Sequence, residues 1–356
     1  MRVALAALLL SYAPAFSHAP VLSYEPAAEL ARFADARIAE SSGVSASARS
    51  NDVLFTHNDS GDSARFFAVD RRGATLGVFD VEGARAEDWE DMARGRADDG
   101  GPALFLADIG DNFRRRSSVV VYEVREPVVH GDAVVPVLRR HRLRYEDGPH
   151  DAEALLVHPR DNALFVVTKE RDGTGGVYRA VDGTLHRVGE VRLGPLVRRP
   201  GAYAKAVTSG EIAPDGQRVV LRTPFEAFEW DLDDGEDSGD DGDEVAAALA
   251  GPPRRIALPE TKQGEAIAYT RDGRSLVTTS EGVEAPLHLI AGDTSGPDLL
   301  ALREPPPPSD AGDHRRWLWV GVAALGAVVA LTALGRALGG RRRRRRRPPS
   351  SGPRPA

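Results

Sequence analysis

The chain of 356 residues contains no cysteine, and only three of its 46 basic residues are lysines. Without cysteine there is no disulfide, no thiolate metal site and no cysteine nucleophile. The sequence also has no G-x-S-x-G elbow, no P-loop and no dinucleotide fingerprint. Serine hydrolase chemistry and nucleotide binding through these motifs therefore have no support.

Long hydrophobic runs are scarce and lie near the two ends. Met1-Arg2 precedes the apolar run Val3–Leu10 and then small residues, which predicts a secretory signal peptide over 1–19, cleaved after Ala15 or Ala19. Near the other end, residues 317–334 contain no charge. About twenty apolar residues cross a bilayer, so we expect a transmembrane helix over 317–338.

Seven consecutive arginines, Arg341–Arg347, follow the apolar run. A basic block directly after a span stays in the cytoplasm, so residues 339–356 are predicted to be a cytoplasmic tail. Pro305–Pro308 makes 304–316 a stiff, Pro-rich stalk. These features predict a single-pass protein of the cell membrane with its amino-terminal domain outside.

Charge is distributed unevenly. Between the predicted signal peptide and the membrane span, residues 20–313 hold 34 Lys and Arg against 53 Asp and Glu. A domain this acidic does not seek nucleic acid, but it can attract divalent cations. Residues 231–244 are especially acidic and predict a solvated, disordered insertion.

A hairpin pattern recurs along the domain. A short apolar strand, a turn and a second strand that ends in an acid begin near Glu40, Asp88, Asp151, Val207 and Gln263. Third strand-like runs follow at 65–70, 119–124, 176–180, 227–231 and 287–291. Fourth runs follow at 75–79, 138–145, 185–193, 254–258 and 299–303.

Four short strands repeated about five times predict an all-β fold, a β-propeller spanning residues 30–303. The repeat count gives five blades. Six blades result if residues 125–150 or 181–204 contain another.

The repeats place acids at matching positions. Glu90, Glu153 and Glu265 each precede a first strand, which lines the central channel of a propeller, so we expect them to converge on the axis. Gathered carboxylates repel and raise one another's pKa unless a counter-charge compensates. The predicted ligand or channel residues are Glu90, Glu153, Lys169, Glu170, Glu211, Lys262, Glu265 and Glu281.

Two counter-charges are compatible with the sequence. One is Ca²⁺, which takes six to eight oxygen ligands; the predicted ligands are Asp59, Asp62, Asp88, Asp108, Asp111 and Asn112. The other is lysine, because Lys169, Lys205 and Lys262 all lie beside the repeated motif.

The motifs THNDSGD, DWEDMA, DIGDN, DAEALLVHP, VTKE and QGEAIAYTRDG…LVTTSEG resemble exported actinobacterial β-propeller proteins of unassigned function, over residues 40–303. More remotely, DAEAL and the last hairpin are similar to β-propeller phytases and phytase-like esterases. That likeness implies a Ca²⁺-dependent propeller with an acidic channel and phosphomonoesterase chemistry. A full phosphate-binding basic set is not matched here.

Two functions follow from these observations. The first is a non-catalytic, membrane-anchored surface propeller, stabilised by Ca²⁺, whose acidic face binds a ligand or surface partner. The alternative is a Ca²⁺-dependent, phytase-like hydrolase of phosphoric monoesters.

Overall fold

The computed structural model describes residues 23–201, 203–232 and 241–292. The chain divides into two compact units, Met1–Ala301 and Leu302–Ala356, and all described residues belong to the first. The predicted signal peptide, stalk, membrane helix and tail lie outside the described residues. Among those described, no helix combines the length and the apolar character that crossing a bilayer requires.

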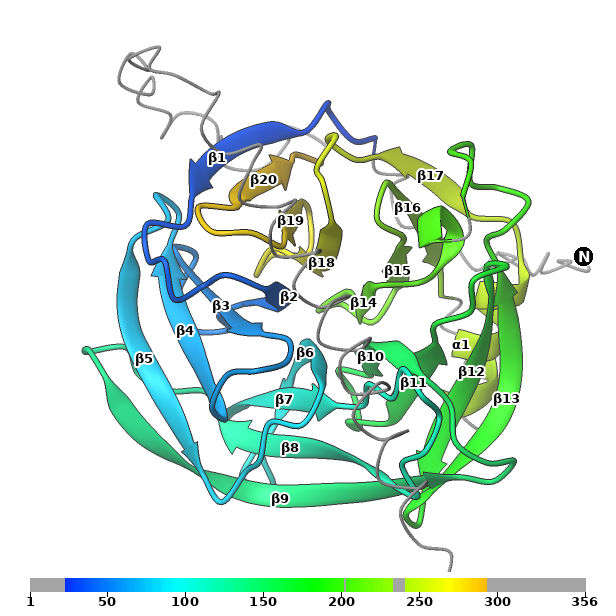
Figure 1. Cartoon of the computed structure of the whole chain (residues 1–356), viewed down its shortest axis with the longest axis horizontal. Helices are drawn as coiled ribbons and strands as arrows, with labels where there is room; N and C mark the ends of the chain where they lie inside the picture. Colours follow the sequence, from blue (N-terminus) through cyan, green and yellow to red (C-terminus); the bar gives the residue numbers. More distant parts are fainter. Residues whose placement is uncertain (1–22, 202, 233–240, 293–356) are drawn as a thin grey trace, which may run out of the picture. The chain divides into compact units, whose positions relative to one another are not determined.

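The described residues form twenty β-strands, arranged as five four-stranded antiparallel blades around a centre (Figure 1). Blade 1 contains β2 (Ser41–Ala46), β3 (Val53–Asn58), β4 (Arg65–Asp70) and β5 (Thr75–Glu82). Blade 2 contains β6 (Trp89–Arg96), β7 (Pro102–Asp108), β8 (Val119–Arg125) and β9 (Ala133–Tyr145). Blade 3 contains β10 (Ala152–Val157), β11 (Leu164–Thr168), β12 (Thr174–Val181) and β13 (Thr184–Arg192).

Two further blades complete the ring. Blade 4 contains β14 (Ser209–Ile212), β15 (Arg218–Arg222), β16 (Glu226–Asp231) and β17 (Arg254–Ala257), and a short 3-10 helix, Tyr203–Lys205, precedes it. Blade 5 contains β18 (Gly264–Tyr269), β19 (Leu276–Ser280), β20 (Pro286–Ile290) and β1 (Ala28–Arg32). The five predicted repeats are thus present, and neither 125–150 nor 181–204 contains a sixth blade.

Blade 5 is closed by the start of the domain. β1 pairs with β20 as its fourth strand, with Ala28 opposite Leu289 and Arg32 opposite Pro286. We expected this place to be taken by residues 299–303, which lie outside the described residues. Pairing the first strand with the last blade joins the two ends of the described ring.

Neighbouring blades are held together by apolar clusters. Five such clusters occur among the described residues, one at each junction between adjacent blades. Between blades 1 and 2, for example, Phe55 and Phe66 pack with Trp89 and Leu104. The first strands of the blades are almost completely buried, because they face the centre of the ring. The ring is therefore closed by its own hydrophobic cores.

One prediction about the acidic insertion needs correction. Helix α1 (Asp241–Ala250) occupies part of the segment 231–244 that we expected to be disordered, and residues 233–240 lie outside the described residues. The helix forms because Val245 and Leu249 pack into a core cluster with Trp230. Apolar residues beyond the acids thus decide where the helix lies.

Candidate functional site

The first strands of blades 1, 2, 3 and 5 share a β-bulge near their start. The register shifts lie at Ser41/Gly43, Trp89/Asp91, Ala152/Ala154 and Gly264/Ile267. A bulge re-aims the side chain of its extra residue and is frequent beside functional sites. The residues within these bulges include Ser42, Glu90, Glu153 and Glu265.

A backbone hydrogen bond repeats beside each bulge. A residue just after the second strand, the first in blades 1, 3 and 5 and the second in blade 2, donates its N–H to a backbone carbonyl. The acceptor lies two positions before the bulge residue. The pairs are Asp59 to Glu40 at 3.0 Å, Gly110 to Asp88 at 3.2 Å, Lys169 to Asp151 at 2.9 Å and Glu281 to Gln263 at 3.0 Å. Four blades therefore present three equivalent residues each at one end of the first strands.

We call these twelve residues the axial cluster. They are Glu40, Ser42, Asp59, Asp88, Glu90, Gly110, Asp151, Glu153, Lys169, Gln263, Glu265 and Glu281. Eight carry a carboxylate and one carries an amine. The first strands surround the centre of the ring (Figure 1), and the axial cluster lies at one shared end of these strands. Glu90, Glu153 and Glu265 thus occupy matching positions in their bulges; their convergence on the axis stays a prediction.

Three members of the cluster are close enough to share one ion. Asp59, Asp88 and Glu90 each offer a carboxylate oxygen, and these oxygens lie within 4.8 Å of one another. Glu90 is only 3% exposed, and no hydrogen bond to its carboxylate is made within the described part of the chain. Burial, with the charge of Asp88, raises the pKa of Asp59 to about 7. Burial and the charges of Asp59 and Asp88 also raise the pKa of Glu90.

Gly110 forms one wall of this three-carboxylate site. A Cβ at this position would lie 2.3 Å from Oε1 of Glu90 and 2.5 Å from Oδ2 of Asp88. Only a residue without a side chain therefore allows the two carboxylates to occupy these positions.

Lys169 is the one lysine in the axial cluster. Its Nζ pairs with Oε1 of Glu153, whereas the buried Oε2 of Glu153 has no hydrogen-bond partner among the described residues. The charge of Lys169 also opposes the rise in the pKa of Glu90, Glu265 and Glu281. Arg116 likewise opposes the rise in the pKa of Asp88, and Arg222 opposes the rise in the pKa of Glu265.

The blade 5 carboxylates form a second group beside Lys169. Burial, together with the charge of Glu281, raises the pKa of Glu265 to about 7. The pKa of Glu281 is raised by burial and by Glu40, although Gln263 Nε2 donates to its Oε2 at 2.6 Å.

Several predicted ligands are instead neutralised within the chain. Asp62 binds Arg65 at 2.8 Å, and Asp108 binds Arg116 at 2.8 Å. Glu170 binds Arg114 at 2.6 Å.

Asp111 and Asn112 lie in the loop that follows β7. Oδ2 of Asp111 accepts the N–H of Arg116 at 2.7 Å, and its own N–H donates to Asp151 at 2.9 Å. Asn112 is exposed in the same loop. The loop thus uses Asp111 to support Asp151, a member of the axial cluster.

Glu211 lies away from the axial cluster. Blade 4 has no bulge in its first strand, and Glu211 lies further along β14. There it binds Arg94 of β6 at 3.1 Å, and Arg94 also donates to the carbonyl of Tyr269 at 3.1 Å. Lys262 is exposed before β18, and Lys205 ends the 3-10 helix.

Sequence reasoning missed Asp91, the residue after Glu90. Its buried carboxylate accepts N–H groups of Leu155 at 3.0 Å and Gly210 at 3.2 Å, and the hydroxyl of Ser209 at 3.1 Å. Asp91 therefore links the first strands of blades 2, 3 and 4, at the position directly after Glu90. Asp91 is part of the DWEDMA motif, but the spacing of the acids in that motif does not show that Asp91 has a different role from Asp88 and Glu90.

A buried arginine, Arg222, was also missed. Its guanidinium donates to the carbonyls of Ala266 at 2.9 Å, Thr279 at 3.2 Å and Pro224 at 3.1 Å. Burial lowers its pKa to about 10. Arg222 thus joins blade 4 to blade 5. In the sequence, its place at the end of the buried run RVVLR was the one indication that it is buried.

Comparison with known proteins adds little to this picture. No family model matches the chain, and no curated protein sequence matches it. Among solved structures, the WD40 repeats of RRP9 match with a TM-score of 0.41 and 9% identity, covering 76% of this chain and 100% of that one. The structure of U3-55K matches with a TM-score of 0.41 and 10% identity, covering 75% and 98%. The propeller assignment therefore rests on the strand pairing and on the five cores between blades.

Proposed function

We propose that this protein is a surface β-propeller that binds a divalent cation, Ca²⁺, through Asp59, Asp88 and Glu90, and that this acidic face binds an external ligand or partner. The observation that supports the proposal most strongly is the carboxylate of Glu90. It is buried, has no hydrogen-bond partner among the described residues and lies within 4.8 Å of two further carboxylates. Three carboxylates so placed need a counter-charge.

The donor set suits a hard cation. Ca²⁺ binds carboxylate oxygens in flexible geometries and completes its shell with water or ligand oxygens. Gly110 leaves the space that a side chain would fill against Glu90 and Asp88. The cation would relieve the repulsion that raises the pKa of Asp59 and Glu90. Its remaining coordination positions give an oxygen-bearing ligand a place to bind.

The distribution of basic residues favours binding over phosphoester hydrolysis. Arg114 and Arg116, on the loop that follows Gly110, are held in ion pairs with Glu170 and Asp108. Lys169 is the one amine in the axial cluster, and it pairs with Glu153. A phosphoesterase needs cationic groups aimed at the phosphate, and these residues leave few to supply them. The phytase-like activity remains the alternative proposal.

The place of action is proposed from the sequence. The predicted signal peptide and membrane span would put the propeller outside the cell, where Ca²⁺ is abundant enough for a site of modest affinity. Sites with Kd of about 10⁻⁴–10⁻³ M are typical of extracellular modules.

Calorimetric titration of the chelator-treated, full-length protein tests the proposal. We expect Ca²⁺ to bind with at least one site per chain, and more tightly than Mg²⁺, which dehydrates reluctantly. If Ca²⁺ gives no heat of binding and does not raise the melting temperature, the cation site is refuted. A panel of phosphate monoesters, assayed with and without Ca²⁺, separates the two functions, because Ca²⁺-dependent turnover would favour the alternative.

A further inference from the structure

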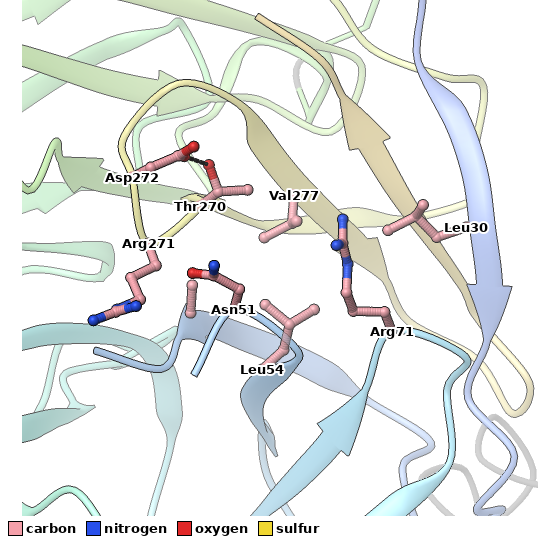
Figure 2. A pocket seen from close by; sticks show the side chains of 9 residues that line it. Leu30, Asn51, Leu54, Arg71, Thr270, Arg271, Asp272 and Val277 are labelled. Atoms are coloured by element: carbon pink, nitrogen blue, oxygen red, sulfur yellow. Dashed lines mark hydrogen bonds between the residues drawn. The ribbon is translucent and has the colours of Figure 1, made fainter. Parts of the chain in front are cut away.

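A small groove lies between blades 1 and 5 (Figure 2). By the strand bounds, it is at the opposite end of β2, β3, β18 and β19 from the axial cluster. Three turns border it: β2–β3 with Asn51, β4–β5 with Arg71, and β18–β19 with 270–272. Its apolar wall is Leu30, Ala46, Leu54 and Val277. The groove thus combines aliphatic surface with a polar edge.

The polar edge contains an unpartnered cation. Arg71 is partly buried and has no hydrogen bond or ion pair within the described part of the chain. The other buried or partly buried arginines described all have partners: Arg65, Arg94, Arg116, Arg179, Arg218, Arg222 and Arg254. Arg71 is the exception among these partly buried arginines, and a guanidinium binds carboxylates well, so the groove suits an anionic group.

The size of the groove indicates what else fits. Its cavity of about 40 Å³ has room for roughly three water-sized spheres. That is the size of one branched aliphatic side chain. A leucine beside a carboxylate would match both the apolar wall and Arg71.

The described chain ends close to this groove. The N–H of Gly292 donates to Oγ of Ser275 at 3.2 Å, and Ser275 pairs through its carbonyl with the N–H of Thr270, which borders the groove. The sequence then continues as DTSGPDLLA, residues 293–301. Six residues extended span about 20 Å. Asp298, Leu299 and Leu300 are therefore within reach of the groove.

We propose that the segment 297–301, Pro-Asp-Leu-Leu-Ala, docks in this groove, with a leucine against Leu54 and Val277 and Asp298 beside Arg71. The segment offers both features that the groove lacks, an aliphatic side chain and a carboxylate at adjacent positions. The fourth-strand position of blade 5 is already filled by β1. Docking covers the apolar wall between the first and last blades.

Cross-linking in the full-length protein tests the docking. The chain has no cysteine, so Asn51→Cys and Leu300→Cys introduce a unique pair for a short bis-maleimide. The control pair is Ser63→Cys with Leu300→Cys, since Ser63 is exposed in the β3–β4 loop at the other end of the strands. Peptide mass spectrometry should show severalfold more cross-link within one chain for the Asn51 pair. Equal yields would overturn the proposal, and cross-links between two chains would assign the groove to a second copy.

Charge exchange supplies the second test. Arg71→Glu should reduce the cross-link, and combining it with Asp298→Arg should restore it, while the melting temperature shows that each variant folds. Hydrogen exchange supplies a third readout: amides 299–301 should exchange more slowly in the unmodified protein than in the Arg71→Glu variant. Unprotected amides in the unmodified protein, or no rescue by the double exchange, would contradict the docking and leave the groove to a partner's acidic, aliphatic segment.

Discussion

Asp59, which follows β3 of blade 1, and Asp88, which precedes β6 of blade 2, place their carboxylates in contact. Burial and this like-charge contact raise the pKa of Asp59. Such a contact is unfavourable in the absence of a counter-ion. A cation would turn it into an attraction between blades.

Asp59→Asn should therefore weaken Ca²⁺ binding and stabilise the cation-free protein, because it removes one of the repelling charges. We expect the affinity to fall at least tenfold, about 1.4 kcal/mol. Calorimetry measures the affinity, and thermal unfolding in chelator measures the stability. Asp62→Asn is the matched control in the same loop, since Asp62 is already paired with Arg65. Equal losses in both variants would contradict a specific role for Asp59.

Acidification should affect the cation-free and cation-bound protein in opposite directions. Without cation, the pKa values of Asp59 and Glu265 are each raised to about 7, by burial and by neighbouring carboxylates. Below that value the folded state holds more protons than the unfolded state. The free energy of unfolding should therefore rise as pH falls from about 8 to about 5.

With saturating Ca²⁺ the melting temperature should fall over the same range, because the ligands must be deprotonated to bind it. Melting curves in chelator and in Ca²⁺, measured across this pH range, test the prediction. Parallel pH dependences in the two conditions would show that Ca²⁺ does not bind the titrating carboxylates.

The sequence was sufficient for the repeat but not for the closure of the ring. Each hairpin shows its strand pair locally, so the five blades follow from counting. The fourth strand of blade 5 depends on pairing between β1 and β20, at opposite ends of the domain. The repeat pattern predicts residues 299–303 for that place, because strand pattern alone does not show that residues 28–32, AELAR, pair with β20.

The candidate site, too, was only partly predictable from the sequence. Glu90, Glu153 and Glu265 occupy equivalent positions because each lies at the same bulge, which their shared motif reflects. Glu211 does not, because blade 4 lacks the bulge. Asp62 and Asp108 find arginine partners through tertiary contacts that spacing does not reveal.

Gly110→Ala should abolish cation binding while leaving the fold intact. The added Cβ would meet Oε1 of Glu90 at 2.3 Å and Oδ2 of Asp88 at 2.5 Å, so both carboxylates would have to move. Circular dichroism checks the fold, and calorimetry checks Ca²⁺ binding. Gly101→Ala is the control, because its nearest neighbour is the end of the exposed Arg125 side chain, which can move away. Unchanged affinity in Gly110→Ala would place the cation elsewhere.

Arg222→Met should destabilise the protein by more than about 2 kcal/mol, because each buried carbonyl left without a donor costs about 1–3 kcal/mol. The carbonyls of Thr279 and Pro224 lose the guanidinium as donor, whereas the carbonyl of Ala266 keeps the hydroxyl of Thr278 at 2.8 Å. Denaturant unfolding measures the loss. Arg274→Met, at an exposed turn of blade 5, is the control and should change stability by less than about 0.5 kcal/mol. Similar stability of the two variants would show that Arg222 does not hold blades 4 and 5 together.

An anomalous difference map from crystals grown with Ca²⁺, recorded at long wavelength, tests the cation site most directly. The proposed site predicts a peak about 2.3–2.6 Å from carboxylate oxygens of Asp59, Asp88 and Glu90. The absence of a peak among these three residues, at a Ca²⁺ concentration that saturates the protein in solution, would contradict it.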